Sequence, residues 1–336
     1  MAEIKLFKAE ELRHLATESL QKAGMSDDYA QIMSEVLVEA DLRGVNTHGM
    51  AMLPLYFRRL QKSIVNPKPN MQVVKESPLY ALFDGDNGPG HLVSVKAMSI
   101  CIDKAKQSQV GIVGVRNSNH FGAAAYYSMM ALKENLIGFS ATNVPPLIPP
   151  YGGTTPTFGN NPFSIAIPTG GKFPIVLDIA TSNVAFGKVF QARQTGQKIP
   201  LNWALDKNGR PTDDPEVAYQ SASLQGIGEH KGYGLSVAID ILSGVLTGAL
   251  FARDISPRGI GVGHFFAAFN PEMFMPLDEF NNRLERMMAQ VKETSLADGY
   301  ERVYLPGEKE YLCKEERLKK GIPLPPHIYE QLDEIK

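Results

Sequence analysis

The feature that most constrains the fold is a repeated change between strand-like and helix-like patterns from about Met71 onward. The apolar segment "LYALFD" before a glycine-rich turn predicts a strand, and a helix is expected over about residues 92–108. The strand-like segment "GIVGVRN", a helix in "AAAYYSMMALKEN" and the strand-like segment "LIGFSATN" follow in order. Strands and helices that alternate in this way bury their apolar sides by packing against one another. The pattern therefore predicts a mixed α/β chain.

Helices are expected in the first part of the chain. Apolar residues recur at helical spacing over residues 9–23, and Ser26 is placed to cap a second helix that Gly44 ends. A third helix is expected to begin near His48 and to end at Asn66-Pro67.

The later part of the chain also predicts helices, and the two ends are expected to meet. The long apolar run "GLSVAIDILSGVLTGALF" contains Asp240, so it predicts a buried helix and not a membrane span. Termini are often neighbours in a fold, so residues 1–70 and 275–336 are expected to form one helical domain. Residues 71–274 are then expected to form the sheet and a cofactor-binding domain.

The composition excludes several classes of protein. Hydrophobic residues make up 43% of the chain and charged residues 21%, as in soluble globular proteins. A net charge of -2 argues against nucleic acid or an anionic membrane as partner, because both attract a basic surplus. The two cysteines, Cys101 and Cys313, form no metal-binding spacing and fit a reducing compartment. The start, "MAEIKLFKAEELRHL", lacks the apolar core of a signal peptide, so we expect a cytoplasmic protein. We expect no metal site.

The common catalytic fingerprints do not occur in this chain. No G-x-G-x-x-G follows a strand and opens a helix, and there is no G-x-x-x-x-G-K-[ST]. A Rossmann cofactor site and a P-loop are therefore not supported. The nucleophile elbow G-x-S-x-G and the zinc motif H-E-x-x-H are absent as well.

The unusual material is five small clusters of Gly, His, Asn, Asp and Lys in expected loops or at element ends. They are Thr47-His48-Gly49, "NSNHFG" at 117–122, "YGG" to "GNNP" at 151–162, "DIATS" at 178–182 and "HKGYG" at 230–234. Each has an ordinary structural interpretation when taken alone, such as a helix cap at His48 or Asp178 and a solvated helix start at Lys231. Their joint occurrence favours a functional interpretation, because loops carry most catalytic and binding residues.

Taken together, these segments resemble the malate/L-lactate dehydrogenase family that is distinct from the Rossmann-fold dehydrogenases. The resemblance runs from about Leu12 to Leu332 and rests on the order and spacing of several segments. These are "ADLRGVNTHG", "DGDNGPG", "VRNSNHFGAAAYY", "IGFSATN", "PPYGG", "GNNPFSIAIP", "LDIATSNVAFGK", "IPLNWALDKNGRPTDDP", "HKGYGLSVAIDILSGVL" and "YLPGE".

The resemblance implies an NAD(P)-dependent oxidoreductase that transfers a hydride between a nicotinamide cofactor and a small 2-hydroxy or 2-oxo acid. It implies a non-Rossmann α/β (α+β) fold with a mostly antiparallel central sheet flanked by helices, the terminal helices packed together. It also implies a homodimer. The sequence has neither a recognisable ribose-binding acidic residue nor a recognisable 2′-phosphate arginine site, and NAD is favoured over NADP.

The resemblance also implies a role for individual residues. His48 occupies the position of the family's catalytic histidine, and the hydroxyl of Thr47 can bind the substrate or orient the imidazole. His120 stands where the family has a histidine near the nicotinamide and the substrate. A histidine suits proton transfer because its ordinary pKa lies near neutral pH. The implied cofactor contacts are Asn143 or Val144, Asp178-Ile179-Ala180, Lys231-Gly232 and Pro306-Gly307-Glu308.

One position departs from the family pattern. Met52 stands four residues after His48, where the family usually has an arginine that binds a carboxylate. Either another cation, such as Arg116, Arg58 or Arg59, takes over this task, or the substrate is not an ordinary dicarboxylate. We include Met52, Tyr56 and Arg116 among the expected substrate contacts.

The resemblance leaves three alternatives open beside a malate- or lactate-like substrate. The chain could be a ureidoglycolate dehydrogenase, a reductase of cyclic imino acids, or a nucleotide-binding homologue that lost turnover.

Overall fold

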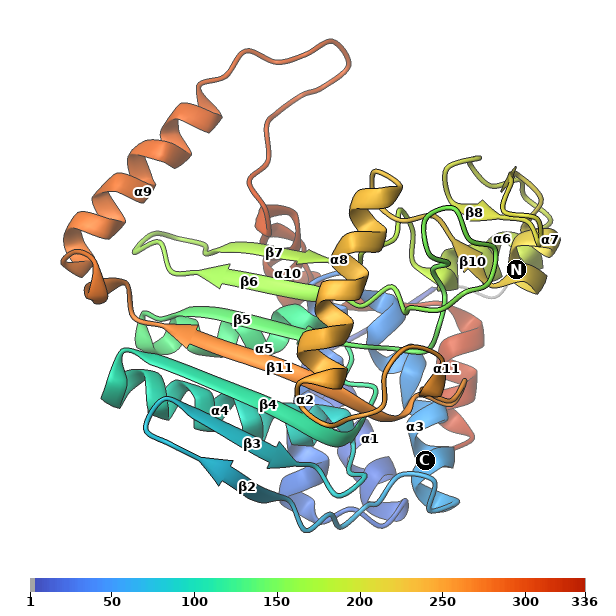
Figure 1. The fold of residues 1–336 in the computed structure, drawn as a ribbon, viewed down its shortest axis with the longest axis horizontal. Coiled ribbons are helices and arrows are strands. Elements are labelled where there is room, and N and C mark those ends of the chain that lie inside the picture. The colour runs from blue at the N-terminus through green and yellow to red at the C-terminus, as the bar shows by residue number, and fades with distance from the viewer. Residues whose placement is uncertain (1–3, 336) are drawn as a thin grey trace.

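A computed structural model describes residues 4–335 of the 336-residue chain. Its centre is a seven-stranded sheet in the order β2-β3-β4-β11-β5-β6-β7 (Figure 1). The strands are β2 (Gln72–Glu76), β3 (Tyr80–Asp84), β4 (Val110–Asn119), β5 (Ile137–Thr142), β6 (Phe163–Ile167), β7 (Ile175–Ile179) and β11 (Ile260–Phe269). Only β3 and β4 pair in parallel, and every other neighbouring pair is antiparallel. The mostly antiparallel sheet that the resemblance implied is therefore confirmed.

Helices cover the two faces of this sheet unequally. On one face α4 (Gly90–Ser108) packs against β4 and β11, and α5 (Ala124–Met130) packs against β5 and β6. A Cβ at Gly111 of β4 would collide with the carbonyl oxygen of Cys101, so the glycine allows α4 to lie directly on the strand. On the other face lies α8 (His230–Asp240), which crosses the strands in front of β11 (Figure 1). On this face a π-helical turn, η4 (Ile241–Val245), continues α8.

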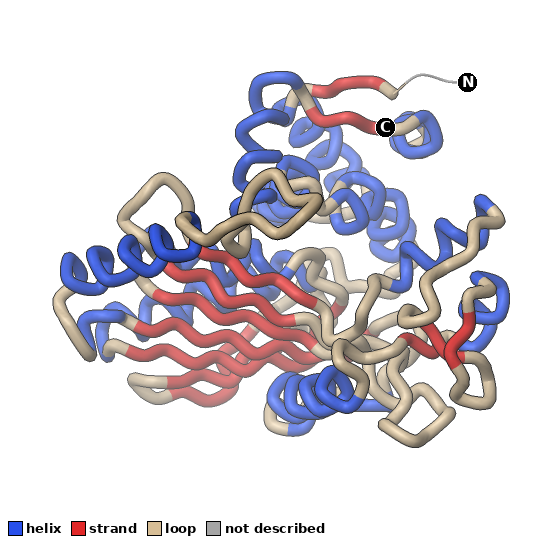
Figure 2. Tube along the Cα trace, turned by 90° about the horizontal axis from the view of Figure 1, so that it is seen from above, coloured by secondary structure: helices blue, strands red, loops and turns tan. Residues whose placement is uncertain are grey.

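Both ends of the chain contribute to one helical layer beside the sheet. Its elements are β1 (Lys5–Phe7), α1 (Ala9–Lys22), α2 (Asp27–Leu42), α3 (Leu53–Gln61), α10 (Glu308–Lys320), β12 (Ile322–Leu324) and α11 (Pro326–Asp333). β1 pairs with β12, so the two termini lie close together (Figure 2). Buried Leu12, Leu37 and Leu53 share one hydrophobic cluster with Ile322 and Leu332. The core of this layer is thus completed only when the C-terminal segment docks.

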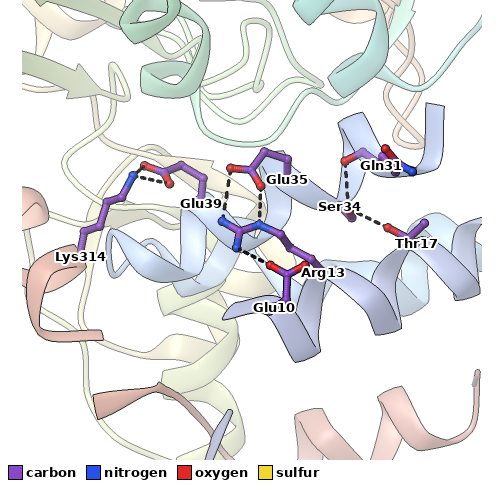
Figure 3. Close-up of polar contacts among 8 residues, drawn as sticks. All are labelled: Glu10, Arg13, Thr17, Gln31, Ser34, Glu35, Glu39 and Lys314. Carbon is purple, nitrogen blue, oxygen red and sulfur yellow. Dashed lines mark hydrogen bonds and ion pairs between the residues drawn. The ribbon is translucent and has the colours of Figure 1, made fainter. Parts of the chain in front are cut away.

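Ion pairs support this layer at its surface (Figure 3). Arg13 of α1 bonds Glu35 of α2, and Lys314 of α10 donates to both carboxylate oxygens of Glu39 of α2 at 2.7 Å. The second pair ties a helix near the C-terminus to one near the N-terminus.

A smaller unit lies beyond the carboxyl end of β7. It contains a three-stranded sheet and two helices around a cluster of buried residues that includes Val189, Ala204 and Leu224. The elements are α6 (Phe186–Thr195), β8 (Ala204–Leu205), β9 (Pro211–Thr212), α7 (Pro215–Ser221) and β10 (Ser223–Leu224).

Two expectations from the sequence are wrong in detail. The third helix does not begin near His48: two 3-10 turns, η1 (Asn46–His48) and η2 (Met50–Met52), come first, and α3 begins at Leu53. The helix cannot start earlier because the backbone at Gly49 is extended, with φ -94 and ψ -143. The apolar run after Lys231 is not a buried helix, since Leu246 is 64% exposed and Val245 is 52% exposed. Among residues 4–335 no helix is long and apolar enough to cross a membrane.

The helix α9 (Leu277–Lys292) has no counterpart in the packed layers. None of its residues is buried, and it stands apart from the body of the molecule (Figure 1). The chain returns from it through a long loop to α10.

Candidate active site

A pocket of about 170 Å³ opens where the helical layer meets the ends of the central strands. One wall comes from the start of α3, and the other from the segments that follow β4 and β5 and precede β11. It is lined by Met52, Leu55, Tyr56, Arg59, His120, Thr142, Asn143, Val144, Pro145, Pro257, Arg258, Gly259 and Val262. The sequence-predicted residues Met52, Tyr56, His120, Asn143 and Val144 therefore meet in one place.

His120 is held in this pocket by Tyr56. The Tyr56 hydroxyl and His120 Nδ1 lie 2.7 Å apart, and Nε2 has no hydrogen-bond partner in residues 4–335. Burial lowers the pKa of His120 well below its ordinary value, and the charges of His48, His91 and Arg59 lower it further. When Nδ1–H donates a hydrogen bond to the tyrosine oxygen, Nε2 carries the lone pair and is the basic nitrogen.

His48 lies beside His120 but belongs to a different part of the fold. The two rings are stacked, with centroids 5.5 Å apart and planes 23° from parallel. The Thr47 hydroxyl lies 2.9 Å from His48 Nδ1 and can orient the imidazole, one of the two roles that the resemblance implied; its contact with the substrate stays a prediction. Burial lowers the pKa of His48, so it is mainly uncharged at neutral pH. His48 itself is not among the residues that line the pocket.

A buried histidine that the sequence did not mark supports the strand side of the pocket. His264 of β11 bonds Ser118 of β4 through Nε2 at 2.7 Å and Thr142 of β5 through Nδ1 at 2.8 Å. It is completely buried, and burial lowers its pKa to about 3. A neutral imidazole thus joins the strands that lead to His120 and to Asn143. Its position within an apolar strand pattern had given no sign of this role.

Two arginines bring positive charge to the pocket. Arg59 comes from α3 and Arg258 from the loop before β11, and neither has an ion-pair partner within residues 4–335. Burial lowers the pKa of Arg59, the nearby Tyr56 raises it, and the positive charge of Arg258 lowers it. Among residues 4–335, no acidic side chain lines this pocket. The pair therefore favours an anionic ligand.

Arg116 lies apart from this pair. Its Nε donates to the carboxylate of Asp84 at 2.9 Å, and it does not line the pocket. Its predicted contact with the substrate stays a prediction. Of the cations considered from the sequence, Arg59 enters the pocket and Arg58 is exposed. Arg258 was missed because a single arginine in a loop carries no pattern.

The predicted cofactor segments are joined by hydrogen bonds behind the pocket. The Asn143 side chain accepts a hydrogen bond from the Gly263 amide and donates one to the Leu250 carbonyl. It therefore organises the backbone and has little freedom to bind a ligand. Asn161 accepts from the Val144 amide at 3.0 Å and donates to the Ser236 carbonyl of α8 at 2.9 Å. The segment after β5 is thereby linked to the helix that begins near Lys231.

Asp178 and the residues after it lie at the end of β7. The Asp178 carboxylate accepts from the Ala125 amide at the start of α5 at 3.0 Å, and burial raises its pKa to about 6. Beyond Ile179 and Ala180, the Thr181 carbonyl accepts from the Ile227 amide at 2.9 Å. A Cβ at Gly232 would collide with that carbonyl oxygen, so the glycine lets the two segments touch.

Lys231 and the turn at Pro306 complete the predicted cofactor set. Lys231 is exposed in the first turn of α8 and has no acidic partner in the described part of the chain, so it fits a phosphate. The Pro306 carbonyl accepts from the Val176 amide of β7 at 3.0 Å, and Gly307 has a φ of 82°. Glu308 is 4% exposed and is already paired with Lys292 and Arg302. Its carboxylate therefore holds the turn together, its amide donates to the Leu305 carbonyl at 3.1 Å, and its contact with a cofactor stays a prediction.

These residues fit a nicotinamide dinucleotide in their chemistry. Uncommitted Lys231 suits a phosphate, and the glycine turns bring backbone groups close. In residues 4–335 no group of three or more histidine, cysteine or acidic side chains could hold a metal ion.

Comparison with known proteins gives a consistent result over the whole chain. A sequence model of the malate/L-lactate dehydrogenase family matches residues 7–333. A malate dehydrogenase of Pyrococcus abyssi is 41% identical over 97% of this chain and 92% of its own. A ureidoglycolate dehydrogenase (NAD(+)) of Escherichia coli is 34% identical, with 96% and 93% covered. The structure of a sulfolactate dehydrogenase from Methanocaldococcus jannaschii superposes with a TM-score of 0.92 at 38% identity, covering 98% of this chain and 96% of that one.

Proposed function

The chain belongs to the malate/L-lactate dehydrogenase family and is an oxidoreductase of hydroxy acids, and from this premise we propose its substrate class and catalytic residues. The proposed reaction is hydride transfer between NAD(H) and a 2-hydroxy or 2-oxo acid that carries a second anionic group. Malate and sulfolactate are such acids, and both appear in the names of relatives.

The observation that carries this proposal is the composition of the pocket. It combines one histidine, His120, with two unpaired arginines, Arg59 and Arg258, and with no acid. A 2-oxo acid presents one carboxylate beside the reacting carbonyl, and a second anionic group gives the second guanidinium a partner. Arginine binds carboxylate and sulfonate groups well because its donors form a planar fork. Met52, which replaces the family's usual arginine, forms an apolar wall beside them.

We place the proton transfer on His120. Its neutral form accepts the hydroxyl proton at Nε2 when the alcohol is oxidised, and its protonated form returns that proton to the carbonyl oxygen on reduction. Tyr56 holds Nδ1 and therefore decides which nitrogen reacts. His48 stacks against the reacting imidazole and limits its rotation. The assignment of this chemistry to His48, which the resemblance implied, is the competing possibility.

The cofactor, when bound, supplies or accepts the hydride. We propose that Lys231 holds its phosphates, that the backbone of residues 178–180 and 306–308 lines its nucleotide end, and that Val144 lies near the nicotinamide. NAD is proposed over NADP because a relative carries NAD(+) in its name and Asp178 supplies an acidic group near the predicted ribose end.

A substrate panel tests this proposal. The purified protein is mixed with NADH or NADPH and with pyruvate, oxaloacetate, sulfopyruvate or a cyclic imino acid, and loss of reduced-cofactor absorbance is followed. We expect kcat/KM for oxaloacetate or sulfopyruvate to exceed that for pyruvate by at least about tenfold, because a charge-assisted hydrogen bond contributes about 1.5–3 kcal/mol.

Three results would contradict the proposal in different ways. Preference for pyruvate would remove the second anionic group from the substrate. Preference for the imino acid would favour the reductase alternative, and no turnover on any substrate would favour the non-catalytic alternative.

We also propose a cytoplasmic homodimer. Both cysteines are unpaired, as expected in a reducing compartment. Apolar side chains are exposed on α8, on η4 and directly after η4, where Leu235, Ile241 and Leu246 are 40%, 49% and 64% exposed. The uncovered helix α9 adds a second exposed surface, and large exposed apolar surfaces usually mark an interface.

Light scattering at micromolar concentration tests this assembly. A homodimer has a mass of twice 36.9 kDa, and Leu246→Glu is expected to shift the population toward monomer. A fully active monomer of the unchanged chain would refute the assembly.

A further inference from the structure

The short turn that carries Thr47 and His48 rests on a buried carboxylate. Asp41, in the last turn of α2, is 1% exposed, and its Oδ2 accepts from the Met50 amide at 2.7 Å. Gly49 packs directly against this group, and a Cβ at Gly49 would collide with the Asp41 carboxylate. The carboxylate therefore supports the turn from below, and only glycine fits between them.

The same turn is held from the side by a helix near the C-terminus. Arg317 of α10 donates through Nη1 to the backbone carbonyl of Asp41 and to the Asn46 side-chain oxygen, the latter at 2.7 Å. The carbonyl belongs to the last turn of α2, where it also accepts from the Gly44 amide at 3.0 Å, so the guanidinium adds a second bond to it. One guanidinium thus joins the end of α2 to the first residue of η1.

The position of Arg317 is set by further contacts between α10 and α2. Lys314, one turn before it, bonds both carboxylate oxygens of Glu39 (Figure 3). A Cβ at Gly44 would lie 3.1 Å from the Cys313 sulfur, so the two segments are also in close contact beyond the helix. These contacts fix the position of Arg317 relative to the turn at residues 46–52.

The turn is important for the pocket although none of its supports lies in the pocket. It carries His48, which stacks on His120, and it ends at Met52, which lines the pocket. A shift of the turn would therefore move two groups that meet the reacting histidine or the substrate. Shifts of about 1 Å can lower a rate by about 100-fold.

We propose that Arg317 and Asp41 are positioning residues for the active site, acting through the backbone of residues 46–52. Arg317 then contributes to the reaction from the far end of α10 without touching substrate or cofactor. This inference rests on the proposed function for its kinetic consequences, whereas its structural consequence is independent of any activity.

The first test replaces the arginine. Arg317→Met removes both hydrogen bonds and keeps much of the side-chain volume, so we expect kcat to fall by about 10- to 100-fold. The KM for NADH is expected to stay within about twofold, because the predicted cofactor residue of α10, Glu308, lies at the opposite end of the helix and is held there by Lys292 and Arg302. Arg317→Lys keeps one donor and should recover part of kcat. Lys320→Met is the matched control, since Lys320 lies on the same helix and pairs only with exposed Glu316.

The second test replaces the carboxylate. Burial raises the pKa of Asp41 to about 7, so part of the population is neutral at neutral pH. Asp41→Asn has nearly the same shape and still accepts from the Met50 amide, and it should keep most of kcat. Asp41→Ala removes the acceptor and should lower kcat as Arg317→Met does.

Hydrogen exchange of the unchanged full-length protein and of each variant separates positioning from general stability. In Arg317→Met and Asp41→Ala we expect faster amide exchange in residues 45–52, with exchange in α1 and β4 unchanged. Faster exchange throughout the helical layer would show a merely structural role and overturn the proposal. Unchanged exchange and kcat in both variants would overturn it as well. Absence of turnover in the unchanged protein would instead count against the proposed function, and the exchange result would still decide the inference.

Discussion

His48 and His120 are stacked with their ring centroids 5.5 Å apart, but different kinds of structure hold them in place. His120 follows directly after β4, in the middle of the large sheet, and its neighbour Ser118 bonds buried His264. His48 lies in a short turn outside any long helix or strand, held by side chains of α2 and α10. One side of the pocket is set by strand register, and the other by contacts between the two ends of the chain.

This difference divides the site into two halves. The sheet half is built on β4, β5 and β11, and the terminal half is built on α2, α3 and α10. Pairing of β4 with β11 is irregular next to the pocket, with register shifts between Ile260 and Val262 and between Val262 and His264. Such bulges often redirect the chain beside active sites, and here the redirected loop carries Arg258. The sheet half thus supplies the proposed reacting group and one anion-binding side chain. The terminal half supplies Tyr56, which bonds His120, and Arg59, the other proposed anion-binding side chain.

Among the binding residues, the largest effect is expected from removing the arginine of either half. Arg258→Met or Arg59→Met should lower kcat/KM for oxaloacetate by about one to two decades, since a charge-assisted hydrogen bond contributes about 1.5–3 kcal/mol. The loss for pyruvate should be smaller for one of the two variants. That variant identifies the half that binds the second anionic group. Equal losses on both substrates in both variants would show that neither arginine distinguishes the two anions.

A smaller effect is expected at the far end of the sheet half. Lys231→Met should raise the KM for NADH by about tenfold and leave the KM for the oxo acid nearly unchanged, because a lost phosphate contact weakens the cofactor alone. Lys188→Met, on the smaller unit, provides an exposed control. A variant with unchanged cofactor KM would place the phosphates elsewhere.

The order of helices and strands followed from periodicity, because long amphipathic segments and apolar strands are local properties. Residues 9–23 and 92–108 were close to the helices observed. The antiparallel pairing came only from the resemblance, since strand partners such as β4 and β11 are distant in sequence. The start of α3 was misplaced because Gly49 packs against Asp41, a contact that no local pattern contains.

The candidate site was predictable where residues occur in motifs and was missed where they act singly. His48, His120 and Lys231 stand in short clusters of functional residue types. Arg258, Arg317 and His264 stand alone in a loop, a helix and a strand, and only the tertiary fold brings them near the pocket. The exposed side of α8 was mistaken for core because an apolar run does not show what covers it.

The pH dependence of alcohol oxidation, compared among the unchanged protein, His48→Asn and His120→Asn, tests the assignment of His120 most directly. Burial lowers the pKa of His120, so the base is free at neutral pH and kcat/KM should be flat above neutrality. As pH falls through that lowered pKa, kcat/KM should decline by about tenfold per pH unit, because the imidazole becomes protonated. His48→Asn should keep this decline with a modest loss of rate. His120→Asn should lose it and lower kcat by about 10²- to 10⁴-fold. The reverse pattern, with the decline kept in His120→Asn and lost in His48→Asn, would contradict the account.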